Sequence, residues 1–137
     1  INYNMGKYVA MNLIKKMKKK KIKIKNSKIL IMGLTFKENC ADIRNSGIER
    51  VISELKKLNC NLDFHDPWVD RAEIKKKYGA YPKLKLKKNT YDAILVAVGH
   101  NKFKNMGRKV ILDLCKKKYI LYDLKYTFNF DRIDLRL

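Results

Sequence analysis

Lys37 and Arg44 are the residues whose type and spacing point most directly to ligand chemistry. They stand in one stretch, residues 33–46, between an apolar run at 29–32 and an amphipathic segment that begins near Ser46. In an α/β domain, a loop between a strand and the following helix lies at the carboxyl edge of the sheet, where ligands bind. The helix dipole and free amides at a helix N-terminus attract negative charge, as two cations do. The stretch therefore predicts a phosphate-binding loop, with Lys37 as a mobile point charge and Arg44 as a planar fork.

Three further loops are expected near that stretch, because they also follow apolar strands. They span residues 65–68, 99–103 and 123–126, and the carboxyl ends of parallel strands lie at one edge of a sheet. The last of them contributes a third cation, Lys125. Charged donors from separate loops would neutralise two successive phosphates, as a nucleotide diphosphate requires.

Each of these residues also has a purely structural interpretation. A chain with 33 basic residues places lysines in loops by chance, so the position of Lys37 is weak support when taken alone. Arg44 can pair with Asp42 or Asp66 instead of a ligand. Asp66 and Asp123, at strand ends, are equally typical of residues that form turns or caps.

The chain carries none of the common catalytic signatures. Only Gly33 follows the first strand, where a dinucleotide site would have GxGxxG, and there is no GxSxG, Walker or HExxH motif. His65 and His100 stand apart from any serine or cysteine nucleophile, and both are interpreted as structural or incidental. No residue is assigned a catalytic role, so the sequence indicates a binding domain rather than a complete catalyst.

The cysteines give no sign of a disulfide framework or a metal site. Cys40, Cys60 and Cys115 are widely spaced and do not form a metal-ligand pattern. A reducing cytoplasm fits this usage. No apolar run reaches the ~18 residues of a membrane span, and no signal-peptide pattern opens the chain. We therefore expect neither a membrane anchor nor export.

Hydrophobic periodicity predicts the elements that must position these loops. Helices are predicted near residues 4–20, 46–58, 70–78 and 110–115, and strands at 28–33, 60–65, 93–99 and 119–123. Ser46 with Glu49 forms the pattern of a capping box for the second helix, and Asp70 with Glu73 that for the third. The continuous apolar run at 93–99 indicates a strand buried on both faces. Strands that alternate with helices predict an α/β fold with a doubly wound, mainly parallel sheet.

Length and composition predict one folded domain with an unusual charge. The chain has 137 residues, of which 46% are hydrophobic, and its formal net charge is +20. The apolar content suffices for a packed core, and the charge alone would also fit a basic nucleic-acid-binding module. However, the lysines are spread over nearly every polar position, which favours compositional drift over a polyanion site. The densest run, residues 15–25, is interpreted as a solvated linker between a helix and a strand.

Three loop motifs occur in the order GLTFKENC with DIRNS within residues 33–46, HDPW at 65–68 and DLK at 123–125. Together they resemble the C-terminal part of the UDP-glucose/GDP-mannose dehydrogenase family, and in particular its branch that oxidises UDP-N-acetylhexosamines. Residues 1–10 are similar to the end of the long central helix that links the two halves of these enzymes and forms their dimer. The likeness therefore spans the whole chain.

The resemblance implies a Rossmann-like domain that binds the nucleotide sugar of an NAD-dependent UDP-sugar 6-dehydrogenase. Such enzymes oxidise the C6 alcohol of a UDP-hexose or UDP-N-acetylhexosamine to the uronic acid for surface polysaccharide biosynthesis. Phe36 and Lys37 match positions that hold the UDP-sugar, and Lys125 lies at or beside a basic position that contacts substrate. Arg44 matches a position that reaches the NAD cofactor, bound in the other half or in a neighbouring subunit.

The resemblance also implies a division of labour in the intact enzyme. In the family, an N-terminal Rossmann domain binds NAD and carries the catalytic cysteine; neither motif is present here, so Cys40 is not expected to be the nucleophile. Residues 1–25 are assigned to the end of the central helix and a linker, and 26–137 to the UDP-sugar-binding domain. The expected partners are a UDP-sugar and a second copy in a cytoplasmic homodimer, with no nucleic acid and no membrane. A basic nucleic-acid-binding module and a stand-alone nucleotide-binding regulator stay open as alternatives.

Overall fold

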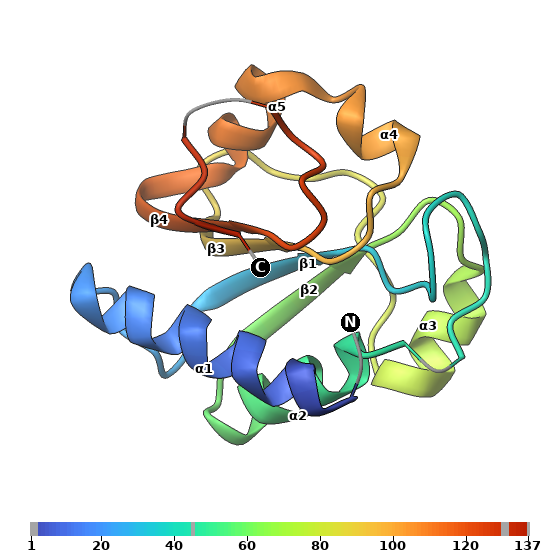
Figure 1. Ribbon diagram of the computed structural model, residues 1–137, viewed down its shortest axis with the longest axis horizontal. Coiled ribbons are helices and arrows are strands. Elements are labelled where there is room, and N and C mark those ends of the chain that lie inside the picture. Colours follow the sequence, from blue (N-terminus) through green and yellow to red (C-terminus); the bar gives the residue numbers. More distant parts are fainter. Residues whose placement is uncertain (1–2, 45, 130–131, 137) are drawn as a thin grey trace.

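Parallel strands form the centre of the molecule, which confirms the predicted α/β fold. The computed structural model describes residues 3–44, 46–129 and 132–136. Within them, five strands form one sheet in the order β2-β1-β3-β4-β5, and every neighbouring pair is parallel (Figure 1). The strands are β1 (Lys28–Met32), β2 (Asn61–His65), β3 (Tyr91–Val96), β4 (Cys115–Asp123) and β5 (Leu135–Arg136), and the helices are α1 (Tyr3–Lys19), α2 (Ile48–Lys57), α3 (Arg71–Tyr78), α4 (Asn101–Lys104) and α5 (Gly107–Leu114).

Helices cover both faces of the sheet, with α1, α2 and α3 on one face and α4 and α5 on the other (Figure 1). Strand β1 contributes to both cores, because successive side chains of a strand point to opposite faces. Ile29 and Ile31 pack among the side chains of α1, α2 and α3, whereas Leu30 and Met32 pack among those of α4 and α5. All four are fully buried, which explains why the strand is continuously apolar rather than alternating.

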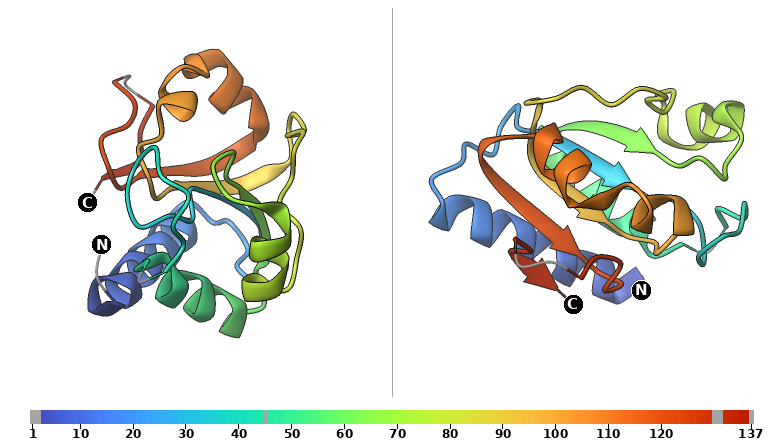
Figure 2. Two further views of the ribbon diagram at one scale, coloured as in Figure 1. Left: turned by 90° about the vertical axis from the view of Figure 1, so that its right-hand side faces the viewer. Right: turned by 90° about the horizontal axis from the view of Figure 1, so that it is seen from above.

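The direction of winding changes at β1, because β2 and β3 lie on opposite sides of it. The loops after β1 and β3 therefore diverge at the carboxyl edge of the sheet, which is where ligands bind in open α/β folds. The left-hand view of Figure 2 looks onto this edge, and the loop after β1, coloured cyan, projects from it. This edge is therefore where the sequence predicts a ligand loop, and the structure places the loop after β1 there (Figure 2).

Helix α1 is built into the same core as the sheet. Val9, Leu13 and Met17 are fully buried and belong to one cluster with side chains of β1 and α2. At Gly6, α1 approaches α2 so closely that an added Cβ would stand 2.7 Å from the Cβ of Arg50. The division of the chain at residue 25 stays a prediction, and α1 packs as an integral layer of the domain.

Differences from the predicted elements lie at helix ends. The hydroxyl of Ser46 accepts the Ile48 amide at 3.4 Å, but within the described residues Glu49 does not return to complete a capping box. Its carboxylate instead pairs with Lys77. That half of the predicted box is wrong, because an ion pair with the neighbouring helix α3 uses the same carboxylate. Asp70 does cap α3, where its side chain accepts an amide hydrogen bond at 2.8 Å.

The second half of the chain also differs from the prediction. The helix expected at residues 110–115 begins at Gly107 and ends at Leu114, so Cys115 starts a long strand instead. Strand β5 was not predicted, because it is only two residues long and carries too little periodicity to be recognised.

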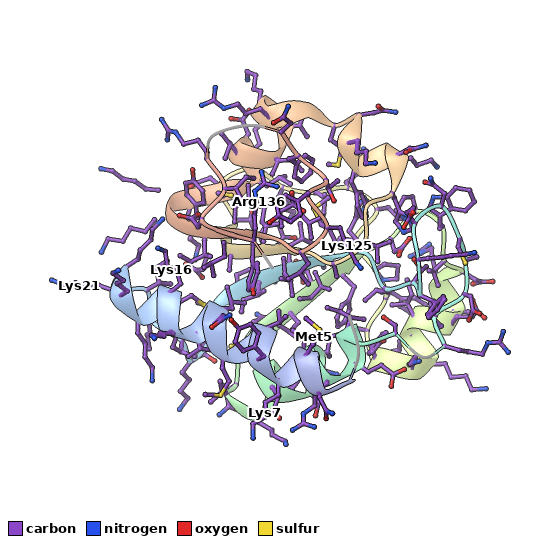
Figure 3. All side chains as sticks on the ribbon, viewed as in Figure 1. Met5, Lys7, Lys16, Lys21, Lys125 and Arg136 are labelled. Carbon is purple, nitrogen blue, oxygen red and sulfur yellow. The ribbon has the colours of Figure 1, made fainter. Side chains whose placement is uncertain are left out.

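Basic side chains project in all directions from the molecule. Lys7, Lys16 and Lys21 extend from α1 and the turn after it, whereas Lys125 lies at the carboxyl edge of the sheet (Figure 3). In the part of the chain that the structure describes, no helix is long and apolar enough to cross a bilayer.

Candidate functional site

A small pocket opens at the carboxyl edge of the sheet, between segments that are far apart in the sequence. Its walls are residues 35–38 from the loop after β1, 46–48 at the start of α2, 97–98 after β3, and Lys125 after β4. All three predicted substrate-binding residues are among them. The cavity measures about 60 Å³, well below the ~300–1,000 Å³ of complete ligand sites. The pocket can therefore enclose one end of a larger ligand.

The pocket combines several positive groups. Lys37 and Lys125, from two different loops, both line it, and the first turn of α2 brings the positive end of a ten-residue helix. Glu38 also lines the pocket and opposes these charges with one carboxylate. Phe36 is 61% exposed and offers its ring beside the pocket. This set of groups suits an anion such as a phosphate, with an aromatic surface next to it.

Gly33 determines how the loop leaves β1. Its φ is 96°, a conformation that glycine adopts freely and other residues rarely adopt. A Cβ at this position would lie 2.7 Å from the Cβ of Val98. The glycine thus allows the loop after β1 to touch the segment after β3, and Val98 in turn forms a wall of the pocket.

The buried carboxylate of Asp66, directly after β2, anchors the loop after β1. Its Oδ2 accepts the Leu34 amide at 2.7 Å and lies 3.1 Å from His100 Nε2, while its Oδ1 accepts the Trp68 amide at 2.9 Å. The side chains of Asp66 and His100 are both fully buried. The turn-forming interpretation of Asp66 is confirmed. The sequence left His100 as either structural or incidental, and the structure shows that it is structural. It is not isolated, because its Nδ1 accepts the Asn39 amide at 2.8 Å.

A second buried carboxylate, Asp123, holds the loop that carries Lys125. Its Oδ1 accepts the amides of Lys125 (3.3 Å) and Thr127 (3.0 Å), and its Oδ2 accepts the Phe128 amide (2.9 Å) and a guanidinium hydrogen of Arg136 (3.3 Å). Arg136, on β5, also donates to the Phe128 carbonyl at 2.8 Å. The short strand β5 therefore helps to position one wall of the pocket, and Figure 3 labels both Lys125 and Arg136.

Arg44 does not share the pocket with Lys37, contrary to the sequence-based expectation. Its side chain is 83% exposed and binds Asp42 through two hydrogen bonds, each of 3.0 Å. The hydrogen bond from the Arg44 side chain is the main reason that the pKa of Asp42 falls from 3.8 to about 2. The alternative interpretation, in which Arg44 pairs with Asp42, is thus confirmed. Lys125 takes the place of the second cation in the pocket.

The three cysteines are free thiols. Burial is the main cause that raises the pKa of Cys115 to about 12, so this thiol stays protonated and unreactive. Cys40 lies in the loop after β1, where its sulfur accepts the Asp42 amide at 3.4 Å. The described residues contain no group of three or more His, Cys, Asp or Glu that could hold a metal ion.

Sequence reasoning offered Asp66 and Asp123 as turn or cap formers, but it missed the side chains that act with them to hold the two loops in place. The signal for the two carboxylates was their place in the sequence, because Asp66 comes directly after β2 and Asp123 is the last residue of β4, where a short acidic side chain can accept loop amides. No comparable signal marked His100 or Arg136. Their partners lie 34 and 13 residues away in the sequence, and only the packing of the strands brings them together.

Comparison with known proteins gives one consistent family. Residues 30–130 match the UDP-binding domain of the UDP-glucose/GDP-mannose dehydrogenase family. Over 137 residues, the chain is 50% identical to UDP-N-acetyl-D-glucosamine 6-dehydrogenase of Salmonella typhi and 43% identical to that of Pseudomonas aeruginosa. Both alignments cover 100% of this chain and 32% of the relative. The chain thus spans about a third of the length of these curated relatives.

A solved structure with the same fold is that of NDP-N-acetyl-D-galactosaminuronic acid dehydrogenase from Methanosarcina mazei Go1. It superposes with a TM-score of 0.73 at 20% identity, covering 95% of this chain and 28% of that chain. At this identity the likeness bears on the fold alone, and it confirms the Rossmann-like arrangement.

Proposed function

The chain belongs to the UDP-glucose/GDP-mannose dehydrogenase family, and we propose that it binds the nucleotide of a UDP-sugar for an NAD-dependent 6-dehydrogenase. One observation carries the proposal. Lys37 and Lys125, from loops at opposite ends of the domain's sequence, line one pocket together with the first turn of α2. A phosphate group there would meet two ammonium groups and a helix N-terminus, which are the donors that favour phosphate in proteins.

The size of the pocket limits what it encloses. A cavity of about 60 Å³ has room for a phosphate but not for a nucleoside or a sugar. In the proposed complex, one phosphate group of the diphosphate occupies the pocket and the rest of the ligand extends outwards. Phe36, whose ring is mostly exposed, packs on or beside the nucleoside. Lys37 and Lys125 neutralise the phosphates.

NAD and the oxidation belong to the proposal for the intact protein. The residues of this chain do not form a dinucleotide site by themselves, because Thr35 and Glu38 stand where a GxGxxG pattern beginning at Gly33 would have glycines. The conformation of Gly33 serves the contact with Val98. We propose that Arg44 contacts the cofactor, and that it leaves its ion pair with Asp42 when NAD binds. Its high exposure makes that exchange possible.

The remaining parts of the proposal follow from the relatives. Both enzymes named above carry UDP-N-acetyl-D-glucosamine in their names, so a UDP-N-acetylhexosamine is the proposed substrate. Residues 1–25 are proposed as the end of a helix that links two domains and two subunits of a homodimer, and 26–137 as the UDP-sugar-binding domain. We place the protein in the cytoplasm and its product in surface polysaccharide biosynthesis.

Isothermal titration calorimetry of the 137-residue chain with UDP tests the binding proposal. Lys37→Ala should weaken binding by about 10-fold or more, since a hydrogen bond to a charged group contributes about 1.5–3 kcal/mol. Uridine, which lacks the phosphates, should bind far more weakly than UDP to the unaltered chain.

Lys87→Ala is the matched control. Lys87 is an equally exposed lysine, but it lies in the segment before β3, at the opposite edge of the sheet. Its replacement removes the same charge and should leave UDP affinity unchanged. If Lys37→Ala and Lys87→Ala weakened binding equally, the +20 charge of the chain as a whole, and not the pocket, would hold the ligand, and the proposal would be wrong.

A further inference from the structure

The segment that lines the pocket is fastened at both of its ends by one buried pair of side chains. Residues 35–38 form the wall, and the amides that flank this wall are those of Leu34 and Asn39. The Leu34 amide donates to Asp66 Oδ2 at 2.7 Å, and the Asn39 amide donates to His100 Nδ1 at 2.8 Å. Asp66 and His100 are joined at 3.1 Å, so a single unit closes the loop.

We propose that His100 is the positioning residue of the UDP site, holding Phe36 and Lys37 at the pocket through its hydrogen bond to the Asn39 amide. This inference rests on the proposed function of the pocket and adds to it a residue outside the pocket wall. His100 touches no ligand in this arrangement. It acts through the loop.

The hydrogen bonds define the protonation of the His100 ring. The Asn39 backbone N–H is a donor, so Nδ1 must supply a lone pair. The neutral ring then carries its hydrogen on Nε2, where the acceptors are Asp66 Oδ2 at 3.1 Å and, at a longer 3.4 Å, the Thr35 hydroxyl oxygen. Each ring nitrogen therefore has one role, and exchanging the roles would leave the Asn39 amide without its acceptor and Asp66 without its hydrogen bond from the ring.

The burial of His100 makes the loss of either of these hydrogen bonds costly. The side chain is fully buried, with the rings of Phe103 and Trp68 centred 5.1 and 6.2 Å from its own. A buried polar group that loses its partner cannot turn to water instead, so the loss has its full cost. The loop therefore has a strong reason to stay where His100 can accept the Asn39 amide.

Asn39 adds a second hydrogen bond between the loop after β1 and the segment after β3. Its φ of 54° lies in the left-handed region, and its side-chain oxygen accepts the Asn101 amide at 3.0 Å. The backbone of Asn39 thus binds His100, and its side chain binds the start of α4. The end of β3 and the loop after β1 are held together by two reciprocal hydrogen bonds.

Amide hydrogen exchange in the unaltered chain, without ligand, first tests the hydrogen bond from the Asn39 amide to His100 Nδ1. The Asn39 amide should exchange at least ~10-fold more slowly than the Glu38 amide, for which the described residues offer no acceptor. Nitrogen NMR of the His100 ring should show hydrogen on Nε2 and a lone pair on Nδ1. Equal exchange rates at Asn39 and Glu38, or hydrogen on Nδ1, would overturn the proposal irrespective of whether UDP binds.

Two variants then test the roles of the two ring nitrogens separately. His100→Asn keeps an acceptor near the position of Nδ1, whereas His100→Gln keeps a donor near that of Nε2. We expect His100→Gln to lose the slow exchange of Asn39 and to bind UDP about 10-fold more weakly, and His100→Asn to retain more of both. A reversed order, or equal losses in the two folded variants, would contradict the role assigned to Nδ1.

His65→Gln is the control for these variants. His65 is the other histidine of the chain and the last residue of β2, and its ring bonds the Lys83 carbonyl rather than the loop after β1. Its replacement should change neither the exchange of Asn39 nor the affinity for UDP. Failure of the unaltered chain to bind UDP would count against the proposed function, whereas the exchange and NMR results decide the position of His100 separately.

Discussion

At the scale of single residues, the loops at the carboxyl edge depend on carboxylates that face inwards. Asp66 and Asp123 are both buried, and each accepts backbone amides of a loop that carries a pocket lysine or leads to one. The lysines that line the pocket are exposed, and the carboxylates that hold their loops are not. Asp42 is different, because it is an exposed carboxylate whose partner, Arg44, lies outside the pocket.

The titration of Asp42 gives a prediction at this scale. The hydrogen bond from Arg44 lowers its pKa to about 2, so Arg44→Ala should move the midpoint back towards 3.8, as followed by NMR of the carboxyl carbon. Because the folded-state pKa is depressed, the contribution to stability is present above pH 3.8 and is lost as the pH falls through about 2.

Both groups are exposed, so the melting temperature at pH 7 should be nearly the same in Arg44→Ala as in the unaltered chain. A large drop in melting temperature would mean that Arg44 supports the fold and is not available to exchange Asp42 for a cofactor.

At the scale of elements, the contact between the loop after β1 and the segment after β3 defines the pocket. It depends on Gly33, where both the backbone angle and the space exclude a side chain. Val98, on the other side of the contact, lines the pocket. A change at Gly33 should therefore affect the fold and the pocket together.

Gly33→Ala should lower the free energy of unfolding by about 2–4 kcal/mol, combining a left-handed alanine with an overpacked contact to Val98. Urea denaturation measures the loss. Gly79→Ala is the matched control, since Gly79 has a similar φ of 82° but nothing within 4 Å of an added Cβ, and it should cost only about 1–2 kcal/mol. Equal losses at the two glycines would show that the contact with Val98 relaxes without cost.

At the scale of the whole molecule, α1 is a layer of the domain as well as the proposed end of a longer helix. One face of α1 is fully buried against β1 and α2, although the other exposes Tyr8 and Met11 to 59% and 61%. The buried face accounts for stability within one chain. The exposed face is the part of α1 that can serve the proposed dimer.

Replacement of a buried residue of α1 tests this view of the molecule. Leu13→Ala should reduce the free energy of unfolding by about 2–5 kcal/mol, the range for leucine truncation in a core, in urea denaturation followed by circular dichroism. Met11→Ala, on the exposed side of the same helix, should change it by less than about 0.5 kcal/mol. If Leu13→Ala were as mild as Met11→Ala, α1 would be a separate segment and not part of the core.

The sequence by itself determined the class of fold, the family, and which loop, the one after β1, would line a pocket. Continuous apolar runs such as Ile29–Met32 and residues 93–98 indicate strands that are buried on both faces, as in the middle of a parallel sheet. The motifs at 33–46, 65–68 and 123–125 mark the loops that follow strands. These are local properties of consecutive residues. They predicted correctly that Phe36, Lys37 and Lys125 would come to one edge.

Only the tertiary structure decided which of the candidate residues form the pocket and what holds them there. Arg44 stands in the same motif as Lys37, yet a short bond to Asp42 keeps it outside, and the isolated His100 became the partner of Asp66 and Asn39. Such pairings depend on which strand ends lie next to one another in space. Hydrophobic periodicity specifies that a segment is a strand or a helix, but it does not specify the partner of a buried polar atom.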